Sequence, residues 1–169
     1  MRYTPAALAL SLLFAVGAST LYSAPAAAPP DPRASALLGQ GQGALAAGQV
    51  EVAIDDFEAA LAIAPGNPAV LLALADASRH EGLQGKALHY YREVLERDPQ
   101  NLAAISGEGA ALAEKGAVEK AKRNLARLQG LCGESCDATR QLAAAIARGP
   151  APRMVSADAV KPAPVVSAD

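Results

Sequence analysis

The sequence predicts an all-α fold in which helical hairpins stack in series. Of the 169 residues, 51% are hydrophobic but only 4% are aromatic, so alanine and leucine supply most of the apolar side chains. This composition suits closely packed helices better than a sheet. Residues of the same type also recur every 34 positions, as glycine does at Gly48, Gly82 and Gly116. The length is that of one domain with appendages.

Residues 1–26 have the pattern of a signal peptide. Arg2 is followed by an uncharged stretch rich in leucine and alanine at residues 6–18, and residues 24–26 fit a small-x-small cleavage site. A retained membrane anchor is the alternative, because residues 6–22 are only slightly shorter than the ~20 residues that a span needs. Residues 27–33 then form a Pro/Ala-rich linker.

The 34-residue period divides the next part of the chain into units at residues 34–67, 68–101 and 102–135. The recurring glycines end the first helix of each unit, where a left-handed residue is needed. Three other columns recur at the same spacing. Small residues stand where two helices cross, at Ala53, Ala87 and Ala121, and large apolar residues follow one turn later, at Phe57, Tyr91 and Leu125. Prolines that stop the second helix stand at Pro65 and Pro99. Asn67 and Asn101 are placed to cap the next helix.

This spacing resembles the tetratricopeptide repeat (TPR) family, whose unit is a helix-turn-helix of 34 residues. The second unit matches best, with Leu71, Leu74, Ala75, Gly82, Ala87, Tyr91 and Pro99. The resemblance implies a right-handed superhelical solenoid of three repeats. It also implies that the first helices of the repeats line a concave groove for a peptide or for a helix of another protein.

Two features depart from the family pattern. Gln40 and Glu108 occupy positions that are usually apolar, and the first helix contains Gly39, Gly41 and Gly43. Each interior glycine costs about 1 kcal/mol relative to alanine. We therefore expect residues 34–47 to form the least stable helix.

The last repeat needs a cap to cover its apolar face. Residues 137–148 are expected to form this capping helix, with Leu142 and Ile146 on an apolar stripe. The domain would then span residues 34–148. Residues 149–169, rich in proline and alanine, are expected to be a disordered tail.

The two cysteines, Cys132 and Cys136, lie on either side of the expected turn before the capping helix. Their spacing allows a disulfide across a tight turn, which would persist in an oxidising compartment. Free thiols and a reactive role are the alternatives. A zinc site needs four ligands, and only the distant His80 and His89 are available; a thioredoxin-like pair has two residues between its cysteines rather than three.

No pattern of residues indicates catalysis or a cofactor. Adjacent Asp55 and Asp56 diverge by about 100° on a helix and cannot act as a catalytic pair. The formal net charge of −2 also excludes a broad basic surface for nucleic acid.

The resemblance assigns residues to the groove by register. These are Leu38, Gln42 and Leu45 in the first unit, Leu72, Asp76, Arg79 and His80 in the second, and Ser106, Ala110 and Glu114 in the third. The lysine and asparagine that relatives use to hold a C-terminal carboxylate are absent from these columns.

The sequence therefore predicts a non-catalytic adaptor or scaffold that binds a protein or peptide in the bacterial cell envelope. The expected location is the periplasm, with membrane contact only if the N-terminal segment is retained. An inner-membrane-anchored assembly protein and an accessory subunit of an envelope enzyme are the alternatives.

Overall fold

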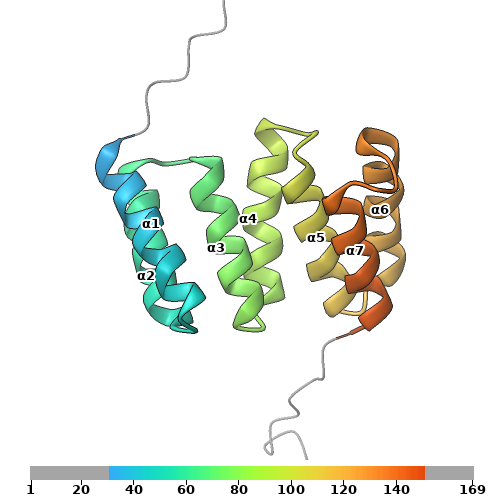
Figure 1. Cartoon of the computed structure of the whole chain (residues 1–169), viewed down its shortest axis with the longest axis horizontal. Coiled ribbons are helices and arrows are strands. Elements are labelled where there is room, and N and C mark those ends of the chain that lie inside the picture. The colour runs from blue at the N-terminus through green and yellow to red at the C-terminus, as the bar shows by residue number, and fades with distance from the viewer. Residues whose placement is uncertain (1–30, 151–169) are drawn as a thin grey trace, which may run out of the picture.

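The computed structural model describes residues 31–150. The predicted signal peptide and nearly all of the predicted tail lie outside this range. The described residues form seven α-helices and no strand (Figure 1). The helices are α1 (Pro32–Ala46), α2 (Val50–Ile63), α3 (Pro68–His80), α4 (Gln84–Arg97), α5 (Leu102–Glu114), α6 (Val118–Cys132) and α7 (Asp137–Arg148).

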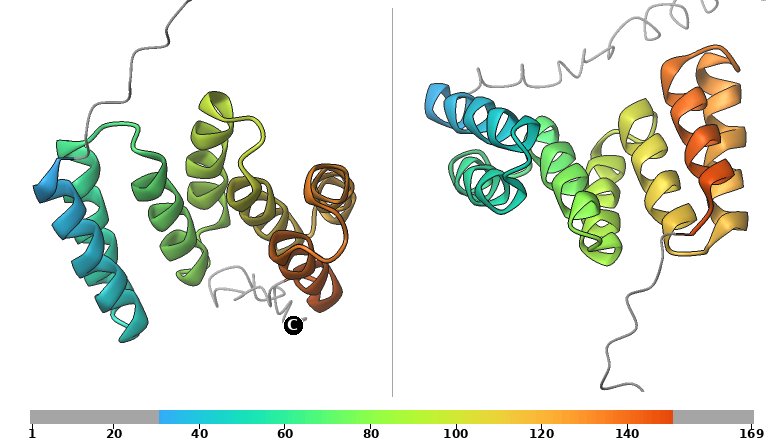
Figure 2. Two further views of the ribbon diagram at one scale, coloured as in Figure 1. Left: turned by 45° about the horizontal axis from the view of Figure 1, so that its top comes forward. Right: turned by 60° about the horizontal axis from the view of Figure 1, so that its bottom comes forward.

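The helices are arranged as three hairpins followed by a single helix. Helices α1 and α2, α3 and α4, and α5 and α6 pair with each other, while α2 contacts α3 and α4 contacts α5. Helix α7 packs against both α5 and α6 (Figures 1 and 2). The hairpins thus stack in series as an all-α solenoid, and residues 137–148 form the terminal helix.

The recurring glycines make the turn inside each hairpin. Gly48, Gly82 and Gly116 have φ values of 77°, 73° and 88°. At the first turn, the Gln49 amide donates to the Ala44 carbonyl at 2.9 Å, and the same six-residue bond closes the other two turns. A side chain would be strained at these φ values, which explains the glycine column.

Polar side chains begin the first helix of every hairpin. Asn67 accepts a hydrogen bond from the Ala69 amide at 2.9 Å, and Asn101 accepts one from the Ala104 amide at 3.0 Å. Asp31 accepts from the Arg33 amide at 2.8 Å in the same way. Helix α1 consequently begins at Pro32, inside the segment assigned to the linker. Asp31 followed by proline is the same helix start as Asn67 followed by proline.

Small residues let the helices approach, and large residues cover them. Ala53, Ala87 and Ala121 are fully buried, as are Phe57 and Tyr91. A Cβ added at Gly41 would lie 2.4 Å from the ring of Phe57, so this glycine is required for packing. Gly39 and Gly43 have no atom within 4 Å of such a Cβ. Only two of the three glycines in α1 therefore weaken the helix without a packing role.

Glu108, the acidic residue at a usually apolar position, joins three helices. Its carboxylate accepts hydrogen bonds from Arg92 of α4 at 2.9 Å and from Asn124 of α6 at 3.0 Å. Its side chain is only 14% exposed. Hydrogen bonds to both carboxylate oxygens offset the cost of this burial.

Candidate functional site

The first helices of the hairpins and α7 follow one another along one side of the solenoid. Helix α1 contacts α3, α3 contacts α5, and α5 contacts α7. This is the side on which the family resemblance places a groove. Helix α7 extends the row, so it both covers the last hairpin and adds a wall to the groove.

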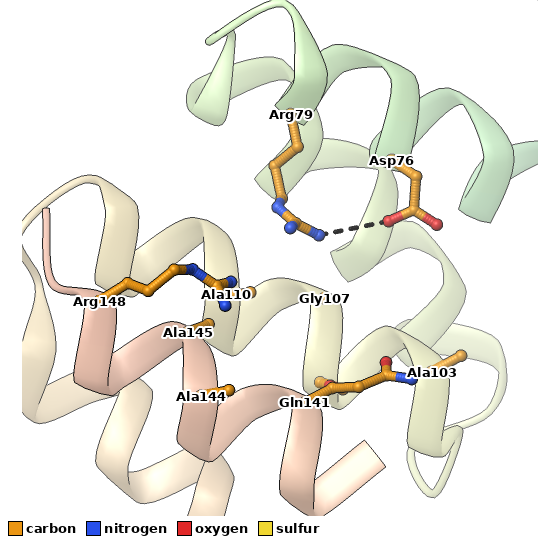
Figure 3. A pocket seen from close by; sticks show the side chains of 10 residues that line it. Asp76, Arg79, Ala103, Gly107, Ala110, Gln141, Ala144, Ala145 and Arg148 are labelled. Atoms are coloured by element: carbon orange, nitrogen blue, oxygen red, sulfur yellow. Dashed lines mark hydrogen bonds and ion pairs between the residues drawn. The ribbon is translucent and has the colours of Figure 1, made fainter. Parts of the chain in front are cut away.

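A cavity of about 350 Å³ opens between α3, α5 and α7 (Figure 3). Asp76 and Arg79 line it from α3, and small residues of α5 form its floor. The remaining wall belongs to α7 and includes Gln141, Ala144 and Arg148. Because Ala103, Gly107 and Ala110 of α5 are small, a bound chain could bring its backbone close to this helix.

Arg79 organises the polar end of the cavity. Its Nε lies 3.2 Å from both carboxylate oxygens of Glu114, and Nη1 lies 3.4 Å from Oδ1 of Asp76. The hydroxyl of Tyr91 donates to the same Asp76 oxygen at 2.5 Å. This network ties α3 to α4 and α5. Arg79 is therefore held in place by carboxylates and is not a free cation.

The Tyr91 hydroxyl stays protonated in this network. Burial, together with the neighbouring Asp76 carboxylate that accepts its hydrogen bond, raises the pKa of Tyr91 well above its usual value of 10.0. The proton keeps Tyr91 as a donor. Asp76 is therefore oriented toward the cavity by a neutral partner as well as by Arg79.

Arg148 is the cation of the cavity that has no ion-pair partner among residues 31–150. Its side chain points across the cavity in Figure 3. It also lines an adjoining cavity of about 400 Å³, together with Arg79, His80, Glu114 and Pro150. The two cavities share Arg79 and Arg148 in their walls, and together they make up the groove.

Six of the residues that the repeat register assigns to the groove line these two cavities. Asp76, Arg79, Ser106 and Ala110 line the first cavity, while Arg79, His80 and Glu114 line the second. The Ser106 hydroxyl, however, donates to the Ala138 carbonyl at 3.0 Å and so fastens α7 to α5. Its main role is structural rather than ligand binding.

The other four assigned residues lie away from these cavities. Leu38 and Leu45 are half-buried against the core of the first hairpin, and Leu72 is half-buried against the central core. Gln42 is exposed on α1. The leucines contact the core because apolar side chains on a first helix also pack toward the second helix, which repeat register alone does not reveal.

Residues of α7 were missed by the sequence-based assignment, which treated this helix only as a cap. Ala144 and Arg148 stand 34 positions after Ala110 and Glu114, so continuing the register would have found both. Gln141 and the Tyr91 hydroxyl had no such signal. They reach the site through contacts between hairpins.

The two cysteines frame the turn before α7. The structure links Cys132 and Cys136, whose Cα atoms are 5.9 Å apart, within the range for a disulfide. The buried Thr139 hydroxyl donates to the Gly133 carbonyl at 2.9 Å and lies 3.1 Å from the Cys136 sulfur. The formation of this bond in the cell stays a prediction.

Residues 31–150 contain no group of three or more His, Cys, Asp or Glu side chains placed to hold a metal ion. In the same range, every helix is too short or too polar to cross a membrane.

The comparisons with known proteins agree with the repeat pattern. The tetratricopeptide repeat family model matches residues 18–68 and 38–101. The Sgt2 TPR domain from Aspergillus fumigatus is 28% identical, with a TM-score of 0.63 over 85% of this chain and 94% of that domain. No curated protein matches the chain in sequence. The chain belongs to the tetratricopeptide repeat family.

Two further solved structures share the fold. The first TPR domain of Spaghetti (RPAP3), solved with the HSP90 peptide SRMEEVD, is 23% identical, with a TM-score of 0.60 over 68% of this chain and 94% of that one. The Arabidopsis OM64 TPR domain is 14% identical, with a TM-score of 0.62 over 69% of this chain and 95% of that domain.

Proposed function

We propose that this chain is a non-catalytic interaction module that binds a peptide or helix of another protein in the groove between α3, α5 and α7. The observation that carries the proposal is the cavity of about 350 Å³. Helices α3, α5 and α7, which are neighbours in space, line it with small residues and fixed polar groups. Such a surface can hold a chain by its backbone and by a few polar contacts. The peptide bound by the RPAP3 domain supports this mode of binding.

The polar groups of the groove favour a ligand that combines hydrogen-bonding backbone groups with a positive charge, rather than a purely acidic ligand. Asp76 offers an exposed carboxylate, and Arg148 offers a guanidinium. Other TPR proteins hold a C-terminal carboxylate with lysine and asparagine at positions of the groove. This chain has other residues at those positions. We therefore expect a ligand with hydrogen-bonding backbone groups and at least one cation.

A matched pair of α7 variants tests the groove. Ala144 is exposed and lines the cavity, whereas Ala147 is exposed on the same helix and lines neither cavity. Ala144→Arg should reduce partner recovery at least tenfold in affinity capture, because its side chain fills the cavity. Ala147→Arg should bind normally. Equal recovery by both variants would count against the groove.

We further propose that the module works in the bacterial cell envelope. Arg2, the uncharged residues 6–18 and the paired cysteines support export to an oxidising compartment. Mass spectrometry of the mature protein distinguishes a free periplasmic chain, which lacks its first ~26 residues, from an anchored one. Recovery of the full-length chain from the cytosol would contradict export.

A further inference from the structure

The second helices of the three hairpins carry a charge that changes sign along the solenoid. Helix α2 contains four carboxylates and no lysine or arginine, whereas α6 contains four cations and one carboxylate. These residues are Glu51, Asp55, Asp56 and Glu58 in α2, and Glu119, Lys120, Lys122, Arg123 and Arg127 in α6. Helix α4 has three cations and two carboxylates. Because α2 and α6 lie at opposite ends of the row of helices (Figure 1), this side of the solenoid is acidic at one end and basic at the other.

The charges at both ends face solvent. Four of these side chains are exposed and have no ion-pair partner among residues 31–150, and they are Glu51, Asp55, Lys120 and Arg123. Glu58 accepts a hydrogen bond from Lys86 of α4 at 2.9 Å. A neighbouring second helix therefore already brings one cation to the acidic end, and the four exposed charges can pair with another molecule.

The repeat places the opposite charges at equivalent positions. Asp55 and Arg123 are separated by 68 residues, which is two repeats, so they occupy the same column on α2 and α6. The flanking charges also correspond within one residue, or about 1.5 Å along a helix; these are Glu51 and Glu58 on α2 with Lys120 and Arg127 on α6. A half-turn about an axis parallel to α4 therefore places the carboxylates of one copy opposite the cations of a second copy.

We propose that two copies of this chain form a two-fold dimer through the outer faces of their second helices, with α2 of each copy opposite α6 of the other. A surface that is acidic at one end and basic at the other is complementary to itself after a half-turn, and two-fold dimers are the commonest symmetric assembly. A second copy satisfies both ends at once. An anionic membrane surface, in contrast, would attract α6 but repel α2.

The size of this side predicts a weak dimer. The second helices have 14 or 15 residues. At about 21 Å in length and about 9 Å apart, three such helices cover about 600 Å² per copy. A total of about 1,200 Å² is at the lower limit of specific interfaces, and exposed ion pairs each contribute little and are screened by salt. The groove is lined by first helices and α7, so it stays open, and the inference does not depend on the proposed function.

Sedimentation equilibrium of the full chain measures the dissociation constant of the dimer. The average mass should rise toward that of a dimer with concentration in about 0.1 M salt, and it should fall in about 1 M salt, where the screening length is only about 3 Å. Asp55→Lys and Arg123→Glu should each raise the dissociation constant about tenfold, because each places like charges opposite one another at both ends. The double variant exchanges the two charges and should return the constant to within about threefold of the unsubstituted chain.

Lys115→Glu is the matched control. It makes the same change in net charge as Arg123→Glu, but Lys115 is exposed at the end of α5, outside these faces, so dimerisation should be unchanged. Four outcomes would overturn the proposal: a monomer at about 1 mM chain, equal effects of Lys115→Glu and Arg123→Glu, a double variant as weak as the single ones, and masses that grow beyond the dimer.

A membrane role for the basic end would give a different result. Arg123→Glu would then abolish sedimentation of the chain with phosphatidylglycerol vesicles and leave self-association unaffected, which would also overturn the dimer. The proposed function is judged separately by the Ala144→Arg and Ala147→Arg pair. A monomeric chain with groove-dependent capture rejects only this inference, whereas a dimer without groove-dependent capture rejects only the proposed function.

Discussion

Tyr91 of the second hairpin lies so close over Gly107 of the third that a Cβ at position 107 would be 2.3 Å from its ring. The ring is buried, and its hydroxyl is held by Asp76. The contact joins α4 to α5 at the floor of the groove. One glycine therefore sets both the spacing of the hairpins and the position of a polar group.

Gly107→Ala should destabilise the domain. Overpacking of this kind costs about 1–3 kcal/mol, because Tyr91 cannot rotate away without losing its hydrogen bond. Urea unfolding would show a lower midpoint with an unchanged slope. Gly130→Ala is the control, since nothing lies within 4 Å of its added Cβ; a lower midpoint for that variant too would contradict the packing explanation.

The three glycines of α1 should respond differently to alanine. Gly39→Ala and Gly43→Ala should each stabilise the domain by about 1 kcal/mol, because both sites are open and alanine favours the helix. Gly41→Ala should destabilise it, because the added Cβ would meet Phe57 at 2.4 Å. Thermal unfolding of the three variants measures the difference, and a uniform response would contradict it.

The unsubstituted α1 should exchange its amide hydrogens faster than the central helices. Gly39 and Gly43 weaken it, and it has a neighbouring hairpin on only one side. Hydrogen exchange read by mass spectrometry compares residues 34–47 with residues 87–95. Equal protection of the two segments would show that α1 is not the least stable helix.

Alkaline pH should destabilise the domain through Tyr91. Its pKa is raised in the folded chain by burial and by Asp76, relative to 10.0 in the unfolded chain. Above pH 10 the unfolded chain therefore binds fewer protons than the folded one, and stability falls as the pH rises. Tyr91→Phe should lose about 1 kcal/mol near neutral pH but show a weaker decline above pH 10. Unfolding curves for the two proteins that decline in parallel would contradict this origin.

Reduction of the cysteine pair should loosen α7. Closing so short a loop stabilises by about 2 kcal/mol in the chain-entropy model, and the loop joins α6 to α7. A reducing agent should speed hydrogen exchange in residues 137–148 while leaving α3 unchanged. The oxidised protein should also be lighter by two hydrogen atoms. Free thiols in the purified protein, or unchanged hydrogen exchange in α7, would contradict a disulfide that holds α7 to α6.

Much of the fold followed from local constraints that the sequence displays. Gly48, with φ of 77°, and Asn67, which caps α3, act within a few residues of themselves, so their columns locate helix ends directly. The same applies to proline after a capping residue. Asp31 was overlooked as a helix start because no earlier repeat provided a register for it.

Contacts between hairpins were harder to predict. Gly107 differs from the alanine at the same column of the second repeat, Ala73, and only the position of the Tyr91 ring explains the difference. The groove likewise depends on α7. The sequence predicts this helix as a cap but does not show that it also forms a wall of the groove. Side chains that meet across hairpins have no fixed spacing in the sequence.

The most direct test of the central claim is site-specific photo-crosslinking from α7 in the full chain. A photoreactive residue at position 144 faces the groove, and one at position 147 is the matched control on the same helix. We predict that a partner protein crosslinks at least tenfold more at 144 than at 147. Equal crosslinking at the two positions, or crosslinking from 147 alone, would contradict binding in the groove.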